Sequence, residues 1–120
     1  MQHKQFQFSA KRVSYYFDAD SKQLKQFCDP AHTIIITDEH VHAAHGKKWK
    51  GWKTIVLKAG EEYKLQQTVD AVIDTLIEME ADRRTMLVGI GGGVVTDIVG
   101  MLGSVYMRGV PFGFVPTTLL

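Results

Sequence analysis

Three consecutive glycines, Gly91-Gly92-Gly93, constrain the fold of this chain more than any other feature of its sequence. The apolar residues 86–90 before them predict a buried strand, and residues 94 to about 106 after them predict a helix. Because this helix is apolar on nearly all sides, most of its surface must be buried. Glycine at such a junction lets the backbone come close to a ligand, and the free N–H groups at the helix start face an anion. A pyrophosphate group is therefore the natural ligand of this turn.

The glycine run also has a purely structural interpretation, in which a tight strand-to-helix turn needs small residues for close packing. Its spacing is not the G-x-G-x-x-G fingerprint of dinucleotide-binding domains, because Thr96 stands where the third glycine would fall. In addition, no acidic residue follows a strand about twenty residues later. The run alone leaves both interpretations open.

The rest of the chain alternates between strand-like and helix-like segments. Alternating apolar residues predict a hairpin over residues 6–17, and a short helix carries Leu24 and Phe27. Further strands are predicted at residues 33–37, 54–57 and 110–115, and apolar residues three and four apart predict a long helix over residues 65–76. This order indicates right-handed crossovers and an α/β, Rossmann-like domain, in which helices flank a mainly parallel sheet.

The composition limits the compartment and the classes of partner. A length of 120 residues with 45% apolar content fits one compact domain. With 14 Lys and Arg against 13 Asp and Glu, the net charge of +1 gives no global field to hold a nucleic acid. The single Cys28 cannot close an internal disulfide, the first residues lack the apolar stretch of a signal peptide, and residues 94–105 are too short to cross a bilayer. We expect a cytoplasmic protein with no membrane span and no nucleic-acid partner.

Ligands of open α/β sheets bind at the carboxyl ends of the strands, so the residues directly after each predicted strand are candidates for a site. Asp38 follows the first predicted strand of the sheet and either contacts a nucleotide or caps the next helix. Glu61 and Lys64 precede the long helix and are otherwise an ordinary surface pair. Thr117 and Thr118 follow the last strand and offer hydroxyls to a ligand or to a cap.

Asp97 is the one carboxylate within the apolar helix. We place it in the first turn, where the helix dipole favours an ionised carboxylate that could bind an amide or hydroxyl group of a ligand. The alternative is a helix-start carboxylate of purely structural value.

Two features that look like binding sites are better explained otherwise. His40, His42 and His45 suggest a metal cluster, but residues 40 and 45 of a helix lie about 140° apart and no carboxylate or cysteine completes the set. Residues 47–53 interleave lysines with two tryptophans, yet they form one short loop in a nearly neutral protein. We expect surface histidines and a solvated turn anchored by one or two tryptophans.

Several short motifs together resemble, in order and spacing, the amino-terminal domain of 3-dehydroquinate synthases. They are G-E-E-Y-K at residues 60–64, G-G-G-V-V-T-D at 91–97, Y-M-R-G at 106–109 and V-P-T-T-L-L at 115–120. Residues 37–41, T-D-E-H-V, look like the first nucleotide-contacting strand end of the same family. One departure is Thr96, where the family usually has glycine, and a side chain there could crowd the nucleotide.

The resemblance implies an NAD-dependent lyase of the shikimate pathway and aromatic amino acid biosynthesis. Such an enzyme converts 3-deoxy-D-arabino-heptulosonate 7-phosphate to 3-dehydroquinate with loss of phosphate. Residues 1–120 would be the NAD-binding domain, while a divalent metal, zinc or cobalt, and most substrate-binding residues would belong to a carboxy-terminal domain absent from this chain. No catalytic or metal-binding residue is then expected here, and the chain alone is expected to be inactive.

Carried over by position, the resemblance also implies roles for single residues. The NAD contacts would be Asp38, Glu61, Lys64, Gly92, Gly93, Val94, Asp97, Thr117 and Thr118. Arg108 matches an arginine that reaches the phosphate of the sugar-phosphate substrate, in the family from the adjacent subunit of a homodimer. A guanidinium fork suits that task.

Three other interpretations stay open at this point. Another sugar-phosphate cyclase, which makes a cyclitol, would differ mainly in substrate residues outside this chain. A related NAD-dependent polyol dehydrogenase would share the two-domain plan, but residues 108–109 and 115–120 argue against it. A non-catalytic nucleotide-binding module is the alternative of a different class.

Overall fold

The computed structural model describes residues 2–8, 11–17, 29–58 and 65–116. Its main elements are β1 (Gln2–Phe8), β2 (Lys11–Phe17), β3 (Thr33–Asp38), α2 (Glu39–His45), β4 (Lys53–Leu57), α3 (Leu65–Glu78), β5 (Met86–Gly91), α4 (Gly93–Val105) and β6 (Phe112–Pro116). Short 3-10 helices are η2 (Pro30–His32), η3 (Gly46–Trp49) and η5 (Tyr106–Arg108). The predicted alternation of strands and helices is confirmed, and the predicted helix with Leu24 and Phe27 lies outside the described residues.

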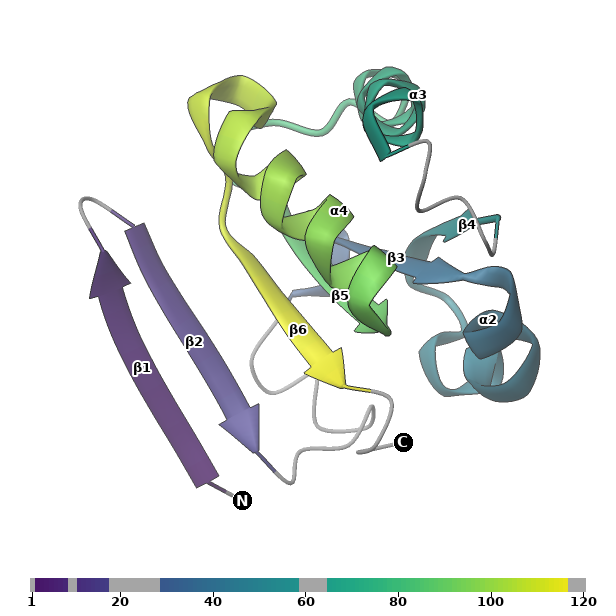
Figure 1. The fold of residues 1–120 in the computed structure, drawn as a ribbon, viewed down its shortest axis with the longest axis horizontal. Helices are drawn as coiled ribbons and strands as arrows, with labels where there is room; N and C mark the ends of the chain where they lie inside the picture. Colours follow the sequence, from purple (N-terminus) through teal and green to yellow (C-terminus); the bar gives the residue numbers. More distant parts are fainter. Residues whose placement is uncertain (1, 9–10, 18–28, 59–64, 117–120) are drawn as a thin grey trace.

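Four strands form a parallel sheet in the order β4-β3-β5-β6. The chain moves outward from β3 to β4 and then returns to the other side of β3 to form β5 and β6 (Figure 1). The direction of winding therefore reverses between β3 and β5, and ligands of such sheets bind outside the carboxyl ends of the strands at this point. β1 and β2 form a separate antiparallel hairpin beside β6. The predicted Rossmann-like fold with an N-terminal hairpin is confirmed.

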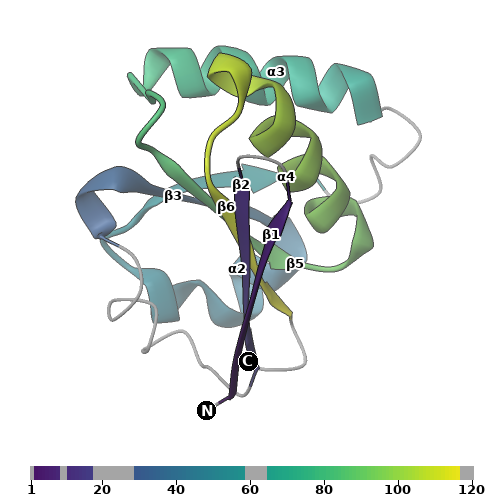
Figure 2. The same ribbon diagram turned by 90° about the vertical axis from the view of Figure 1, so that its left-hand side faces the viewer.

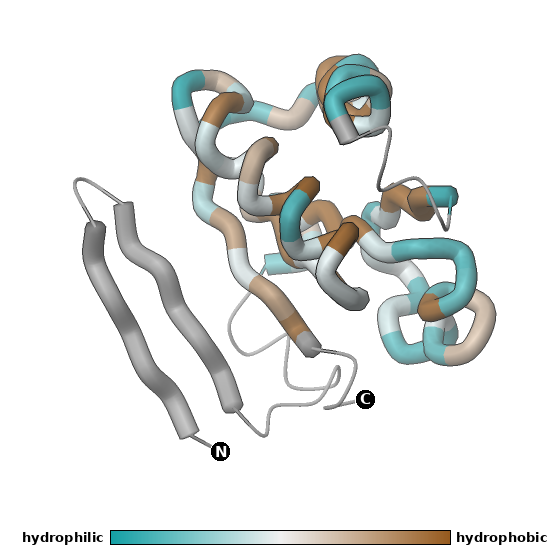
Figure 3. The backbone as a smooth tube through the Cα atoms, in the orientation of Figure 1, coloured by the Kyte–Doolittle hydropathy of each residue, from teal (hydrophilic) through white to brown (hydrophobic). Residues whose placement is uncertain are grey.

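Helices cover both faces of the parallel sheet. Seen from two sides, α3 and α4 lie on one face, and α2 with η3 lies on the other (Figures 1 and 2). In β3, Ile34 and Ile36 belong to the core under α3 and α4, whereas Ile35 points to the opposite core with Trp49 and Trp52. Figure 3 shows hydrophobic residues along the sheet and α4, and hydrophilic residues on the outer turns. As predicted, β3 is buried on both faces and the tryptophans anchor their loop.

The long helix α3 is amphipathic, as its sequence predicts. Val69, Val72 and Leu76 are buried in the core on the sheet, whereas Asp70 and Asp74 are exposed. This pattern fixes the face that α3 turns toward the strands. None of the helices in the described ranges is long and apolar enough to cross a membrane.

The last strand begins two residues later than predicted, at Phe112 instead of residue 110. The reason is the preceding turn, where the N–H of Val110 donates to the carbonyl of Gly103 at 2.9 Å. Val110 is thereby bound to the last turn of α4, and only the residues after Pro111 pair with β5 as a regular strand.

Candidate functional site

The turn from β5 to α4 uses its three glycines for two different purposes. Gly91 is buried, and a Cβ atom there would lie 2.7 Å from Cγ2 of Val95, so glycine is required for packing. Gly92 and Gly93 are exposed, and a Cβ atom on either would have no heavy atom of the described residues within 4 Å. Close packing thus explains the first glycine, while the other two face open space.

The start of α4 is suited to bind an anion. Gly92 is the N-cap residue and has no side chain to accept from the helix, and its carbonyl accepts from the N–H of Thr96 at 3.1 Å. The N–H groups of residues 93–95 therefore have no partner within the helix. Together with the positive end of the helix dipole, they face the space left open by Gly92 and Gly93.

Asp38 stands across from this turn, at the carboxyl end of the neighbouring strand β3. Its Oδ1 accepts from the N–H of Val41 at 2.8 Å, so the side chain caps α2 as one of the two interpretations predicted. Oδ2 makes no hydrogen bond to the residues that the structure describes. The cap therefore holds the carboxylate in place and leaves one oxygen for a ligand.

The prediction that Asp97 lies in the first turn of the helix is wrong. α4 begins at Gly93, so Asp97 is its fifth residue and stands in the second turn, where the dipole acts more weakly. The helix starts earlier than predicted because Gly92 serves as the cap and Gly93 already belongs to the helix. Asp97 is exposed and lies four residues after Gly93, on the same side of α4.

Two side chains of the first turn of α4 are held by contacts within the protein. Val94 packs against the core under α4, so only its backbone is free to meet a ligand. The hydroxyl of Thr96 donates to the carbonyl of Gly93 at 2.9 Å and is thus turned back onto the first turn of the helix. This bond restrains the side chain that replaces the usual glycine of the family motif and could crowd a nucleotide.

Thr37 makes a contact that sequence reasoning missed. Its side chain is 0% exposed, and its hydroxyl donates to the carbonyl of Ile90 in β5 at 2.6 Å. A polar residue within the β-branched run of β3 was the available signal, because a buried hydroxyl needs a partner. The sequence does not reveal which carbonyl it finds.

Arg108 lies at the other end of α4. The 13 residues of this helix rise about 1.5 Å each, which puts roughly 20 Å between its two ends. Arg108 is exposed, and its φ of 66° follows a φ of 51° at Met107 and precedes a φ of 113° at Gly109. The structure therefore does not bring Arg108 together with the glycine turn of the same chain.

Tyr106, two residues before Arg108, is buried and hydrogen-bonded. Its hydroxyl donates to the carbonyl of Ala81 at 2.8 Å, and the side chain is buried. Burial raises the pKa of Tyr106, and the negative charge of Asp82 raises it further. The phenol is thus held in its neutral, donating form.

The other predicted NAD contacts, Glu61, Lys64, Thr117 and Thr118, lie outside the described residues. The last described residues before them are Lys58, which directly follows β4, and Pro116, which ends β6. Both ends lie at the carboxyl edge of the sheet, the same edge as the glycine turn.

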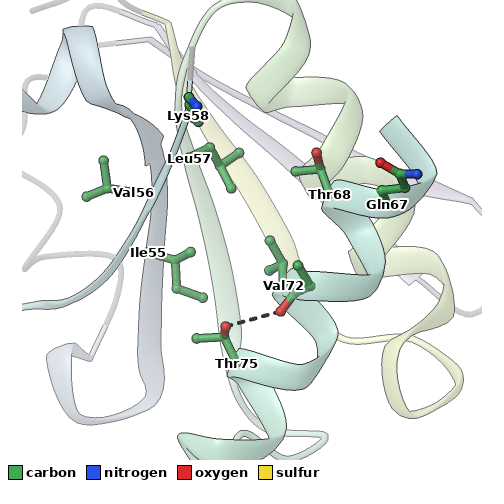
Figure 4. A pocket seen from close by; sticks show the side chains of 9 residues that line it. Ile55, Val56, Leu57, Lys58, Gln67, Thr68, Val72 and Thr75 are labelled. Carbon is green, nitrogen blue, oxygen red and sulfur yellow. Dashed lines mark hydrogen bonds between the residues drawn. The ribbon is translucent and has the colours of Figure 1, made fainter. Parts of the chain in front are cut away.

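A groove between β4 and α3 is a second hollow near this edge (Figure 4). Ile55, Val56 and Leu57 line it from the strand, and Thr68 and Thr75 line it from the helix. The hydroxyl of Thr75 is bound to the backbone of its own helix, at 3.1 Å from the carbonyl of residue 71. Lys58 and Gln67 also line the groove, so its described lining combines an apolar floor with one cation and one amide.

One histidine of α2 makes a side-chain hydrogen bond within the fold. Nδ1 of His42 accepts from the indole N–H of Trp49 at 3.2 Å. His40 and His42 are exposed, as expected for surface histidines. Among the residues with described side chains, no group of three His, Cys, Asp or Glu could hold a metal ion.

Comparisons with known proteins identify the family of this chain. The family model described as 3-dehydroquinate synthase N-terminal matches residues 54–120. The chain belongs to this family. The 3-dehydroquinate synthase of Pyrococcus furiosus is 53% identical over 68 residues, or 57% of this chain, and that of Pyrococcus abyssi is 50% identical over 66 residues, or 55% of this chain.

Among solved structures, the chain resembles 2-deoxy-scyllo-inosose synthase complexed with carbaglucose-6-phosphate, NAD+ and Co2+. That match has a TM-score of 0.72 and 27% identity, and it covers 97% of this chain. The chain spans 20% of the length of each Pyrococcus relative and 35% of the solved chain. The similarity thus extends over one part of longer proteins.

Proposed function

We propose that residues 1–120 form the NAD-binding domain of a 3-dehydroquinate synthase, which converts 3-deoxy-D-arabino-heptulosonate 7-phosphate to 3-dehydroquinate and phosphate. The observation that carries the proposal is that Gly92 and Gly93, at the start of α4, face open space. They lie where the winding of the sheet reverses between β3 and β5. A diphosphate would fill this space and meet N–H groups that have no partner within the helix. Family membership and the NAD+ in the related cyclase structure favour NAD as the nucleotide.

The residues at the turn fit this cofactor. Gly92, Gly93 and Val94 would bind the diphosphate through their backbones, and Asp38 and Asp97 would accept hydrogen bonds from its hydroxyl or amide groups. Bound NAD supplies a reversible hydride transfer with the substrate. The chain itself positions the cofactor, since the cap on α2 holds Asp38 in place and Thr96 is turned back onto the helix. The proposed set is completed by Glu61, Lys64, Thr117 and Thr118.

We further propose that a divalent metal, zinc or cobalt, and most substrate contacts belong to a second domain that follows in the full-length protein. The length of the Pyrococcus relatives, of which this chain spans 20%, leaves room for such a domain. The isolated chain should then bind NAD but release no phosphate from the substrate.

The proposed role of Arg108 is to bind the substrate phosphate of the adjacent subunit in a homodimer. Its exposure and its distance from the glycine turn support a role outside its own nucleotide site. In the full-length enzyme, Arg108→Ala should raise KM or lower kcat strongly and leave NAD affinity nearly unchanged, because a phosphate loses two charge-assisted hydrogen bonds. Lysine should rescue only in part.

Hybrid dimers test whether Arg108 acts across the subunit boundary. Arg108→Ala subunits mixed with subunits inactivated in the metal domain should recover some activity. No recovery in a verified hybrid would place Arg108 at the site of its own chain, and normal substrate kinetics of the single variant would remove it from the site.

The reaction itself is tested by phosphate release from the full-length protein with NAD and a divalent metal. We expect release from 3-deoxy-D-arabino-heptulosonate 7-phosphate. Release only from glucose 6-phosphate would favour a cyclase like 2-deoxy-scyllo-inosose synthase, and NAD reduction by a polyol without phosphate release would favour a dehydrogenase. Binding of NAD with no turnover of any of these would favour a non-catalytic module.

The cofactor assignment is tested by Asp97→Ala and Lys64→Ala in the full-length enzyme. Each should weaken NAD binding by roughly 1–3 kcal/mol, the effect of losing a hydrogen bond to a charged group. Titration calorimetry measures this directly. If both variants bind NAD as the wild type does, these two residues do not contact the cofactor.

A further inference from the structure

The hydroxyl of Thr37 joins the two strands between which the winding of the sheet reverses. Thr37 and Ile90 are direct partners in the register of β3 and β5, and the hydroxyl donates to the carbonyl of Ile90 at 2.6 Å. The side chain is fully buried. This bond is short for a hydroxyl donor, so the two strand ends are tightly connected here.

The acceptor of this bond belongs to the first peptide unit of the glycine turn. The carbonyl of Ile90 shares its peptide plane with the N–H of Gly91, and rotation of that plane would redirect the residues that follow. On the other side of the turn, Val95 packs where a side chain on Gly91 would be. The turn is therefore held from β3 by a hydrogen bond and from α4 by packing.

The open residues Gly92 and Gly93 have no side-chain packing of this kind, and their carbonyls accept from the N–H and from the hydroxyl of Thr96 in α4. A Cβ atom on either would meet no heavy atom of the described residues within 4 Å, and both are exposed. Their position thus depends on α4 on one side and on what fixes Gly91 on the other. Asp38 follows Thr37 and is the last residue of β3. Its carboxylate accepts from the N–H of Val41, and this bond fixes the carboxyl end of β3.

We propose that Thr37 is a positioning residue for the nucleotide: by holding the Ile90–Gly91 peptide, its hydroxyl sets the backbone of Gly92 and Gly93 in the orientation that binds the diphosphate. This inference rests on the proposed function of the glycine turn. Because Thr37 is buried, its hydroxyl would act through the peptide that it holds and not through a contact of its own with the cofactor.

The test compares two threonines of the same strand in the full-length protein. Thr37→Val keeps the shape of the side chain and removes the hydroxyl, and it should raise the Kd for NAD on the order of tenfold, or about 1.4 kcal/mol. Thr33→Val is the matched control, because Thr33 is 1% exposed on the same face of β3 but stands at the opposite end from the glycine turn. It should leave the Kd within about twofold of the wild type even where it lowers the Tm.

A second pair of variants applies if Thr37→Val does not fold. Thr37→Ser and Thr37→Ala are both smaller than threonine and differ from each other only by the hydroxyl. We expect Thr37→Ser to bind NAD within about threefold of the wild type and Thr37→Ala to bind roughly tenfold more weakly than Thr37→Ser.

The outcomes separate this inference from the proposed function. If wild-type protein does not bind NAD, the proposed function itself fails. If the wild type binds NAD and Thr37→Val or Thr37→Ala binds equally well, the positioning role is wrong. An equal loss in Thr33→Val would also overturn it, because the effect would then be one of general stability.

Discussion

The two ends of α4 use glycine in opposite ways. At the start, Gly92 and Gly93 face open space, and an added Cβ atom would touch none of the described residues. At the end, a Cβ atom on Gly103 would overlap the ring of Phe112 in β6. Around Gly103, Val110 is hydrogen-bonded to its carbonyl and the hydroxyl of Tyr106 is bound to Ala81.

This difference separates glycines that the packing of the fold requires from glycines that it does not require. A glycine that packs against a neighbour is explained by the fold alone, and its replacement should act on stability. A glycine that touches nothing has no such explanation, and its replacement should act on whatever enters the space. Gly91, which packs against Val95, shows that both kinds occur within a single turn.

The largest effect is expected for Gly103→Ala. The methyl group must displace the Phe112 ring or push α4 away from β6, so the free energy of unfolding should fall by about 3 kcal/mol. Urea unfolding measures the change. Gly100→Ala is the control, because a Cβ atom there meets none of the described residues within 4 Å and alanine should stabilise the helix by about 0.5–1 kcal/mol.

If Gly103→Ala is as stable as Gly100→Ala, packing does not require glycine at the end of α4. The two ends of this helix would then not differ in how they use glycine. That result would mean that the ring of Phe112 moves aside without loss of packing.

A smaller effect is expected for Tyr106→Phe. The carbonyl of Ala81 loses its buried partner, so the free energy of unfolding should fall by about 1–2 kcal/mol at neutral pH. Thermal unfolding of the variant and the wild type checks this value. Unchanged stability at neutral pH would show that this hydrogen bond adds nothing to the free energy of unfolding.

The same variant has a pH signature. Burial raises the pKa of Tyr106 above its ordinary value of about 10, so the neutral phenol stabilises the fold fully below pH 10. This contribution is lost as the pH rises through the raised pKa. The stability difference between wild type and Tyr106→Phe should therefore shrink above pH 10. A difference that grows above pH 10 would contradict the raised pKa of Tyr106.

The smallest effect is expected at Met107, which has a φ of 51° and an exposed side chain. Glycine adopts this left-handed conformation without strain, so Met107→Gly should raise the free energy of unfolding by about 0.5 kcal/mol. Met107→Ala keeps the strain and should show no gain. Equal stability of the two variants would mean that the backbone here is not strained.

Much of the fold could be predicted from the sequence, because local patterns determine it. The β-branched run of β3 and the apolar spacing in α3 correspond directly to their burial. The last strand was placed too early because the bond from Val110 to Gly103 depends on how α4 and β6 meet in space. That contact joins residues whose pairing no local pattern indicates.

The candidate site was predictable in part. The glycine run was found, but the sequence could not separate Gly91, which packs, from Gly92 and Gly93, which do not. Asp97 was placed one turn too early, since the start of a helix depends on which residue becomes its cap. The bond of Thr37 was missed because its acceptor is a backbone carbonyl 53 positions away.

The central claim, that Gly92 and Gly93 leave space for the nucleotide, is tested most directly by NAD titration of Gly93→Ala in the full-length protein, with Gly100→Ala as the control. A methyl group on Gly93 touches none of the described residues, so stability should be unchanged or slightly higher. The account predicts that Gly93→Ala nevertheless weakens NAD binding by at least about 1.4 kcal/mol, a factor of ten, while Gly100→Ala binds NAD as the wild type does. Wild-type NAD affinity in a folded Gly93→Ala variant would contradict it.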